Sequence, residues 1–187
     1  MRVIAGSAGG LRLVAPPDRA TRPIADRVKE TLFAILGERA IDARACDLYA
    51  GSGAIGIEAL SRGAATCDFV ERGRAALAAI RQNLAQTGLA DRGSVHGTDV
   101  LRFLGGESVG DYDLAFLDPP YDLRDILAPL ERLLPHLAPG ATVAVKHFWR
   151  TPIPEASGLA RWRERRFGET AITFLRATAA GHRVEES

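Results

Sequence analysis

From about residue 43 onward, hydrophobic residues follow two alternating patterns. Short, nearly continuous apolar runs alternate with longer stretches in which apolar residues recur every three or four positions. The short runs predict buried strands, and the longer stretches predict amphipathic helices. The strands are expected at residues 45–49, 67–71, 94–96, 112–117 and 141–146, and the helices at residues 54–62, 73–87 and 127–137.

This alternation of strands and helices favours one particular fold class. Consecutive βα units build a mostly parallel, doubly wound α/β sheet with helices on both faces. In such sheets, ligands bind outside the carboxyl ends of the strands. The loops that follow the expected strands are therefore the places to search for chemistry.

The two ends of the chain carry different patterns. Apolar residues on both sides of Gly6-Ser7-Ala8-Gly9-Gly10 predict a hairpin within residues 1–20, and a helix is expected over residues 25–37. Near the other end, residues 161–166 and 171–176 are expected to form an antiparallel pair, so that the last strand runs against the sheet. Residues 178–187 are expected to be a flexible tail.

Size and composition limit the class of protein. The 187 residues, 47% of them hydrophobic, are enough for one domain over residues 1–187 and too few for two. Neither the apolar core of a secretory signal nor a membrane-spanning run occurs in the sequence, so we expect a cytoplasmic protein without membrane contact. Cys46 and Cys67 each lie in an apolar strand and are expected to be buried, unreactive thiols, and no metal site is expected.

Charge is distributed unevenly along the chain. The net charge is only +1, but residues 1–29 hold six basic and two acidic residues, and residues 161–166 hold four arginines and one glutamate. Such clusters can give a neutral protein one positive face suited to nucleic acid, or they can be ordinary solvated arginines. Composition alone leaves both interpretations open.

A glycine-rich loop follows the first expected strand. It begins at Asp47-Leu48-Tyr49-Ala50 and continues through Gly51-Ser52-Gly53, and Glu71 ends the next strand. The glycine spacing together with Glu71 also fits a nicotinamide-dependent oxidoreductase. An acidic residue such as Asp47 would repel a dinucleotide pyrophosphate, whereas it suits the cationic sulfonium and ammonium groups of S-adenosylmethionine. Glu71 can accept hydrogen bonds from two ribose hydroxyls. We therefore expect Asp47, Ala50, Gly51, Ser52, Gly53 and Glu71 to bind S-adenosylmethionine.

The tetrapeptide Asp118-Pro119-Pro120-Tyr121 follows the fourth expected strand. An amine attached to an aromatic ring is a poor nucleophile because its lone pair is delocalised. The Asp118 carboxylate and the Pro119 carbonyl can accept hydrogen bonds from that amine and so favour attack by its nitrogen, while the prolines fix the backbone. Tyr121 can stack on an extruded base. These residues predict transfer of a methyl group to an exocyclic amine, with Asp118 adjoining the cofactor.

Two further features each allow two interpretations. Asp99, after the third strand, can accept a hydrogen bond from the adenine amine of the cofactor, or it can cap a helix. The basic N-terminal residues, among them Arg22 and Arg27, suit phosphate contacts or a solvated helix start.

Taken together, these motifs resemble the 16S ribosomal RNA (guanine(966)-N(2))-methyltransferase family (RsmD-like). The likeness extends from residue 1 to about residue 122, and beyond that it is one of architecture only. It depends on Arg2-Val3-Ile4-Ala5-Gly6, Thr21-Arg22-Pro23, Asp26-Arg27-Val28, Asp47-Leu48-Tyr49-Ala50-Gly51-Ser52-Gly53, Glu58-Ala59-Leu60-Ser61-Arg62-Gly63-Ala64, Phe69-Val70-Glu71 and Asp118-Pro119-Pro120-Tyr121. At two places the sequence departs from the family: Ile24-Ala25 stand in a loop that is often Thr-rich, and Lys146-His147 end a strand where an acidic residue is common.

The resemblance implies a Rossmann-like class I methyltransferase fold that methylates guanine N2 in 16S rRNA of the small ribosomal subunit. It also implies that the loop from Thr21 to Asp26 covers the cofactor. The N-terminal hairpin would grip RNA through Arg2 and Arg12, together with Arg22 and Arg27, and we expect a monomer. The alternatives are methylation of adenine N6 or of a protein glutamine, an oxidoreductase, and an RNA-binding module without catalysis.

Overall fold

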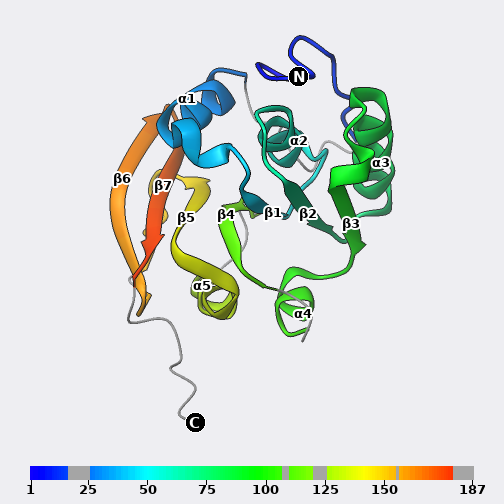
Figure 1. Ribbon diagram of the computed structural model, residues 1–187. Coiled ribbons are helices and arrows are strands. Elements are labelled where there is room, and N and C mark those ends of the chain that lie inside the picture. Colours follow the sequence, from blue (N-terminus) through cyan, green and yellow to red (C-terminus); the bar gives the residue numbers. More distant parts are fainter. Residues whose placement is uncertain (17–25, 107–109, 120–125, 155, 179–187) are drawn as a thin grey trace.

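The computed structural model describes residues 1–16, 26–106, 110–119, 126–154 and 156–178. Within these ranges, seven strands form one sheet in the order β3-β2-β1-β4-β5-β7-β6 (Figure 1). The strands are β1 (Arg44–Leu48), β2 (Thr66–Glu71), β3 (Gly93–Gly97), β4 (Tyr112–Leu117), β5 (Leu137–Phe148), β6 (Leu159–Phe167) and β7 (Thr170–Ala177). Strands β1 to β5 are parallel to one another, and β7 pairs antiparallel with both β5 and β6.

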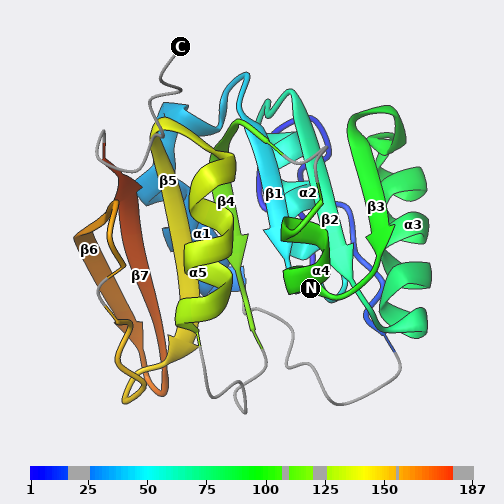
Figure 2. The same ribbon diagram turned by 90° about the horizontal axis from the view of Figure 1, so that it is seen from below.

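Helices cover both faces of the sheet. Viewed from below, α4 and α5 lie in front of the strands, and α1, α2 and α3 lie on the other side (Figure 2). The α-helices are α1 (Asp26–Leu36), α2 (Ala54–Ser61), α3 (Arg74–Thr87), α4 (Val100–Leu104) and α5 (Leu127–Leu133), and short 3₁₀ turns are η1 (Gly37–Ala40), η2 (Ala90–Arg92) and η3 (Leu134–His136). This arrangement confirms the expected doubly wound sheet with an antiparallel last strand.

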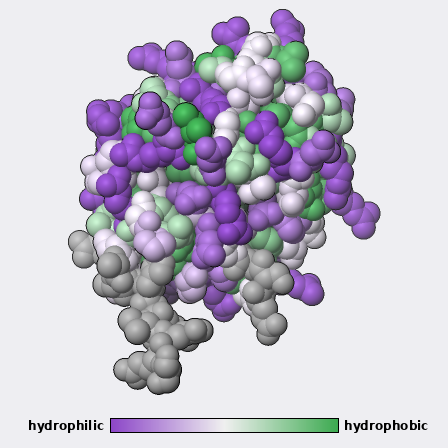
Figure 3. Space-filling model, viewed as in Figure 1, coloured by the Kyte–Doolittle hydropathy of each residue, from purple (hydrophilic) through white to green (hydrophobic). Residues whose placement is uncertain are grey.

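The two faces of the sheet have separate hydrophobic cores. Phe69, Phe116 and Phe174 pack on the side of α1 and α2, whereas Leu48, Leu117 and Val145 pack on the side of α5. Because successive strand residues point to opposite faces, a parallel sheet buried on both faces needs apolar residues at nearly every position. On the side of the molecule seen in Figure 3, hydrophilic residues cover most of the surface and hydrophobic residues form small, separated groups.

The N-terminal segment, residues 1–16, folds back on itself as the expected hairpin, but its arms are not regular strands. One isolated antiparallel bridge, Arg2 with Arg12, joins the arms, together with backbone hydrogen bonds that link Val3 to Leu11, Gly10 to Val3 and Leu13 to Met1. The backbone N–H groups of Ile4 and Ala8 donate to side chains of α2. Val3, Ala8 and Leu13 are also buried in the core on the α2 side, so the segment is packed into the protein.

Two other parts of the chain differ from the expected elements. The sequence did not predict α4, which has only five residues. Helix α5 ends at Leu133, and Leu137, expected to end that helix, begins β5 instead. Pro135 lies between them at the start of the 3₁₀ turn η3, where its missing N–H is tolerated. Both cysteines are buried and free, as expected.

Candidate active site

The glycine-rich loop lies at the carboxyl end of β1, next to the end of β4. The two strands are paired in register up to Leu48 and Leu117, and the N–H of Asp118 donates to the Leu48 carbonyl at 3.3 Å. The loop and the first residue of the Asp-Pro-Pro-Tyr motif are therefore neighbours, although about 70 positions separate them in the sequence. The sheet brings together the two motifs that the sequence had singled out.

Asp47 lies beneath this loop, with a side chain that is almost wholly buried. Its Oδ2 accepts a hydrogen bond from the N–H of Gly56, in the first turn of α2, at 2.9 Å. Burial raises the pKa of the carboxyl well above its usual range, and the Gly56 hydrogen bond opposes that rise. The group joins the base of the loop to the start of α2.

The loop backbone is strained at its entry. Tyr49, a residue with a full side chain, has a φ of 63°. Such left-handed backbone costs of order 1–3 kcal/mol and is concentrated at functional sites. Gly51 has a φ of 56°, and a Cβ on it would meet nothing within 4 Å. The space above Gly51 is open, so a ligand can approach the backbone closely there.

Glu71 holds the loop after β1 against the loop after β2. Its Oε2 accepts the N–H of Gly51 at 2.9 Å, and its Oε1 accepts the N–H groups of Arg72 and Gly73, both at 2.8 Å. An ionised carboxylate offers about four lone-pair positions. Glu71 therefore organises two loops and keeps acceptor capacity for a ribose hydroxyl.

Asp99 caps helix α4. Its Oδ1 accepts the N–H groups of Leu101 and Arg102 at 2.9 and 3.4 Å. The capping interpretation of Asp99 is thus confirmed. Both contacts fall on Oδ1, so Oδ2 is the atom that remains for a hydrogen bond to an adenine amine.

Asp118 follows β4 and is bound by a residue whose role the sequence did not reveal. The ammonium of Lys146, on β5, lies 2.6 Å from Oδ1 and 2.8 Å from Oδ2. Burial raises the pKa of the Asp118 carboxyl, and the charge of Lys146 opposes this rise. Pro119 is half-buried beside Asp118. Pro120 and Tyr121 lie outside the described residues, as do Thr21 and Arg22.

Asn83 is a second residue that the sequence analysis missed. Its side chain is fully buried on α3, and its amide nitrogen donates to the carbonyl of Ser52, in the glycine loop, and to that of Val14, both at 2.9 Å. Its amide oxygen accepts the N–H of Val14 at 2.7 Å. The signal was a polar residue on the buried side of α3, three positions after Ile80.

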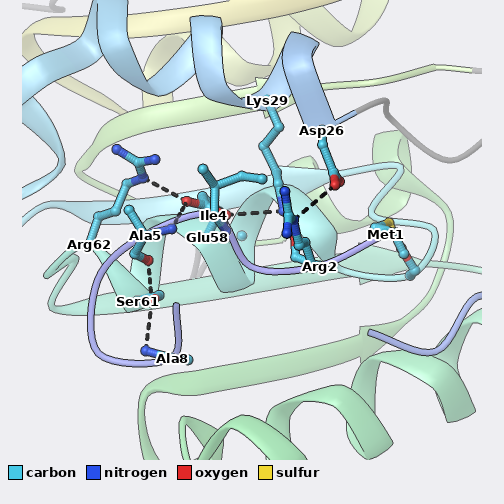
Figure 4. Close-up of polar contacts among 12 residues, drawn as sticks. Met1, Arg2, Ile4, Ala5, Ala8, Asp26, Lys29, Glu58, Ser61 and Arg62 are labelled. Carbon is cyan, nitrogen blue, oxygen red and sulfur yellow. Dashed lines mark hydrogen bonds and ion pairs between the residues drawn. The ribbon is translucent and has the colours of Figure 1, made fainter. Parts of the chain in front are cut away.

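The N-terminal segment is fixed by a buried group of charges, the Glu58 cluster, which comprises Glu58, Lys29, Arg62 and the backbone of Ile4 and Ala5 (Figure 4). The Glu58 carboxylate accepts from the Ile4 N–H at 2.7 Å and the Ala5 N–H at 3.1 Å. Lys29 and Arg62 form ion pairs with it at 3.0 and 2.7 Å. Lys29 also donates to the carbonyl of Arg2. The cluster attaches the segment to α1 and α2.

The expected RNA contacts Arg2, Arg12 and Arg27 are all exposed on the N-terminal segment and α1. Arg2 makes an ion pair with Asp26 at 3.3 Å (Figure 4), with side chains 62% and 39% exposed. Exposed pairs of this kind contribute about 0–1 kcal/mol, so Arg2 can exchange Asp26 for a phosphate at little cost. The second basic cluster, residues 161–166, lies mainly on the exposed parts of the outer strand β6.

The sequence matches a known protein family over most of its length. The model of the family described as Conserved hypothetical protein 95 matches residues 1–176. The chain belongs to this family. It is 34% identical over 187 residues to the Ribosomal RNA small subunit methyltransferase D of Escherichia coli (strain K12), covering 97% of this chain and 92% of that protein.

Two further similarities support this membership. The protein YlbH of Bacillus subtilis (strain 168) is 34% identical over 181 residues, which are 94% of this chain and 98% of that protein. The solved structure of yhhF from Escherichia coli superposes with a TM-score of 0.86 at 32% identity, covering 96% of this chain and 98% of that one. The chain accordingly belongs with the methyltransferases of the RsmD family and has their fold.

In the part of the chain that the structure describes, no helix is both long and apolar enough to span a membrane. The histidine, cysteine and acidic side chains of that part nowhere gather in threes in a way that would hold a metal ion.

Proposed function

We propose that this methyltransferase moves the methyl group of S-adenosylmethionine to the exocyclic N2 of a guanine in 16S rRNA of the small ribosomal subunit. The observation that carries the proposal is the position of Asp118, beside the glycine loop and at the same sheet edge as Glu71. A carboxylate there can accept a hydrogen bond from an amine while the methyl donor lies over the loop. We place this reaction in the cytoplasm and assign it to a monomer made of one domain over residues 1–187.

The described residues fit S-adenosylmethionine. The open backbone at Gly51 gives room for the ligand, and Glu71 has acceptor capacity for ribose hydroxyls. Asp99 offers Oδ2 to the adenine amine. Ala50, Ser52 and Gly53 complete the loop against which the donor would lie, and Asp47 attaches the base of that loop to α2. When bound, S-adenosylmethionine supplies a methyl group on a cationic sulfur.

The protein's own part in the reaction is to orient the amine. Asp118 and the carbonyl of Pro119 would accept hydrogen bonds from the N–H groups of the amine, which leaves the lone pair of the nitrogen free to face the methyl donor. With the donor bound, the nitrogen would take the methyl group, S-adenosylhomocysteine would leave as a neutral thioether, and the amine would lose one proton to Asp118 or to water. No covalent bond to the protein is needed. Tyr121 would stack on the base, and the loop from Thr21 would cover the donor.

RNA would be held by the basic N-terminal surface. Arg2, Arg12, Arg22 and Arg27 are proposed to contact phosphates, which position the RNA without reading its sequence. The Glu58 cluster and Asn83 connect this surface to α2 and to the glycine loop. RNA held by the segment would thereby lie next to the donor.

The test is substitution of Asp118. Asp118→Ala is expected to lower turnover by about 10²- to 10³-fold, because it removes an acceptor used in the transition state. Binding of S-adenosylhomocysteine, measured by calorimetry, should change little. Asp113→Ala is the matched control, since Asp113 lies at the other end of the same strand and is exposed. Turnover would be followed as labelled methyl transfer to small subunits from cells that lack the protein.

Mass spectrometry of the nucleosides and of the ribosomal proteins from those subunits identifies the product. N2-methylguanosine is the expected product, whereas N6-methyladenosine or a methylated protein glutamine would assign the enzyme to one of the alternative classes. A thermal shift with NADH but none with S-adenosylhomocysteine would refute the proposal, and so would wild-type turnover in Asp118→Ala.

A further inference from the structure

Lysine is rare in this chain, and both copies are bound to carboxylates. Lys29 and Lys146 are the only lysines among 24 basic residues. Lys29 makes an ion pair with Glu58 with both side chains 0% exposed, and Lys146 makes one with Asp118 with side chains 11% and 25% exposed. The first pair holds the N-terminal segment. The second, between Lys146 and Asp118, lies at the proposed reaction centre.

The fold dictates the contact between Lys146 and Asp118. Strands β4 and β5 are parallel neighbours, and Leu117 is in register with Val145. Asp118 and Lys146 each come one residue later, at the same edge of the sheet. The ammonium lies 2.6 and 2.8 Å from the two carboxylate oxygens, so it binds both at once and fixes the plane of the carboxylate.

We propose that Lys146 is a positioning residue for methyl transfer, which holds the Asp118 carboxylate in one orientation, as an acceptor for the amine of the base. The proposal rests on the proposed function, because it assumes that Asp118 receives that amine. Lys146 takes one lone pair from each oxygen, and a carboxylate has about four in total. Acceptor capacity therefore remains for the substrate.

The charge of Lys146 has a second effect on the same group. Burial favours the protonated carboxyl, which raises the pKa of Asp118, and Lys146 opposes this. Asp47, on the neighbouring strand β1, is coupled electrostatically to Asp118 with the same sign of charge. Among the described residues, Lys146 is thus the cation that keeps Asp118 in its accepting form. A protonated carboxyl would instead point an O–H at the amine.

The experiment compares three variants of the full chain. Lys146→Met removes the charge at similar length, Lys146→Arg keeps it, and Arg44→Met removes an exposed positive charge from the opposite end of the sheet as the matched control. Lys146→Gln is a second neutral variant in case the methionine variant does not fold. Turnover on methyl-deficient small subunits is measured across pH, together with affinity for S-adenosylhomocysteine and thermal unfolding.

We expect Lys146→Met to lower kcat at neutral pH by roughly 10- to 100-fold, the effect of a misplaced acceptor, with little change in S-adenosylhomocysteine affinity. The acid limb of its kcat profile should move to higher pH, and activity should partly return in alkaline buffer. Lys146→Arg should restore part of kcat at neutral pH, and Arg44→Met should match the wild type. A purely structural role would lower thermal stability without moving the pH profile.

The proposal is overturned if Lys146→Met keeps the wild-type kcat and pH profile. A separate readout, the carbon-13 chemical shift of the Asp118 carboxyl, follows its titration without any substrate. Its midpoint should rise in Lys146→Met, and an unchanged midpoint would also overturn the proposal. Failure of the wild-type enzyme to methylate small subunits, with the shifted midpoint still present, would count against the proposed function and leave the Lys146–Asp118 coupling established.

Discussion

The Glu58 cluster permits a stability prediction whose magnitude follows from burial. Glu58 and Lys29 are both 0% exposed, so water cannot solvate whichever charge is left alone. Removing one partner of a buried pair costs about 3–5 kcal/mol. Glu58→Ala also removes the acceptor for the Ile4 and Ala5 N–H groups. We therefore expect a loss of about 3–5 kcal/mol, a large part of the 5–15 kcal/mol typical of a domain.

Urea unfolding, followed by tryptophan fluorescence and circular dichroism, measures this loss, and an unchanged m-value would show that the same surface is exposed on unfolding. The charge argument is isolated by the double variant Lys29→Met/Glu58→Met. Its cost should fall short of the summed single costs by about 1–3 kcal/mol, because no buried charge is left alone. Arg62 keeps access to solvent in all variants, since its side chain is 23% exposed.

Hydrogen exchange at the Ile4 amide gives a local readout of the same cluster. Exchange should accelerate in Glu58→Ala, since its acceptor is gone. Two results would refute the reasoning: a Glu58→Ala cost below about 1 kcal/mol, which is the value for an exposed pair, or strictly additive single costs in the double variant.

Two further predictions concern the glycine loop and its support. Gly56→Ala should destabilise the protein by about 1–3 kcal/mol in urea unfolding, because the new Cβ would lie 2.4 Å from a ring carbon of buried Phe69. Gly110→Ala, where a Cβ meets nothing within 4 Å, should be nearly neutral, and equal effects would contradict this account. The free energy of unfolding of Asp47→Asn, relative to the wild type, should increase as pH rises. Because the folded-state pKa of Asp47 is raised, its contribution to wild-type stability is full below the unfolded pKa of about 3.9 and is lost as pH rises through the folded-state pKa. Urea titrations of both proteins at pH 5 and pH 8 measure the relative free energy of unfolding, and a value that stays constant or decreases between the two pH values would disprove the prediction.

Much of the fold could be predicted because the spacing of apolar residues within each segment indicates whether that segment forms a strand or a helix. A parallel sheet covered on both faces needs continuous apolar strands, and β1, β2 and β4 supply them within one or two residues of the expected bounds. The glycine loop and Asp118 could be paired in advance because both follow strands of such a sheet. Short elements could not be predicted in this way, because the five residues of α4 are too few to show a helical period.

The contacts that sequence reasoning missed all join distant elements. Lys146 reaches Asp118 only because β5 lies beside β4, and strand order is not visible in periodicity. Glu58 lies in α2, whose residues are all buried, and its partner Lys29 is on another helix. The pattern of the N-terminal arms predicted their hairpin, but not that side chains of α2 accept the N–H groups of Ile4 and Ala8. The local spacing of apolar residues predicts which helices and strands form. Contacts between side chains on different elements depend on how those elements pack in the folded protein.

The double attachment of Glu71 has a consequence for how its variants would behave. One carboxylate holds the turns after β1 and β2 in a fixed relation before any ligand arrives. If Glu71 binds the ribose as proposed, that end of the donor site is built in advance, so little ordering entropy is lost there on binding. Any substitution of Glu71 would then loosen both turns and remove the proposed ribose contact together, and its effect on affinity would exceed that of the lost contact alone.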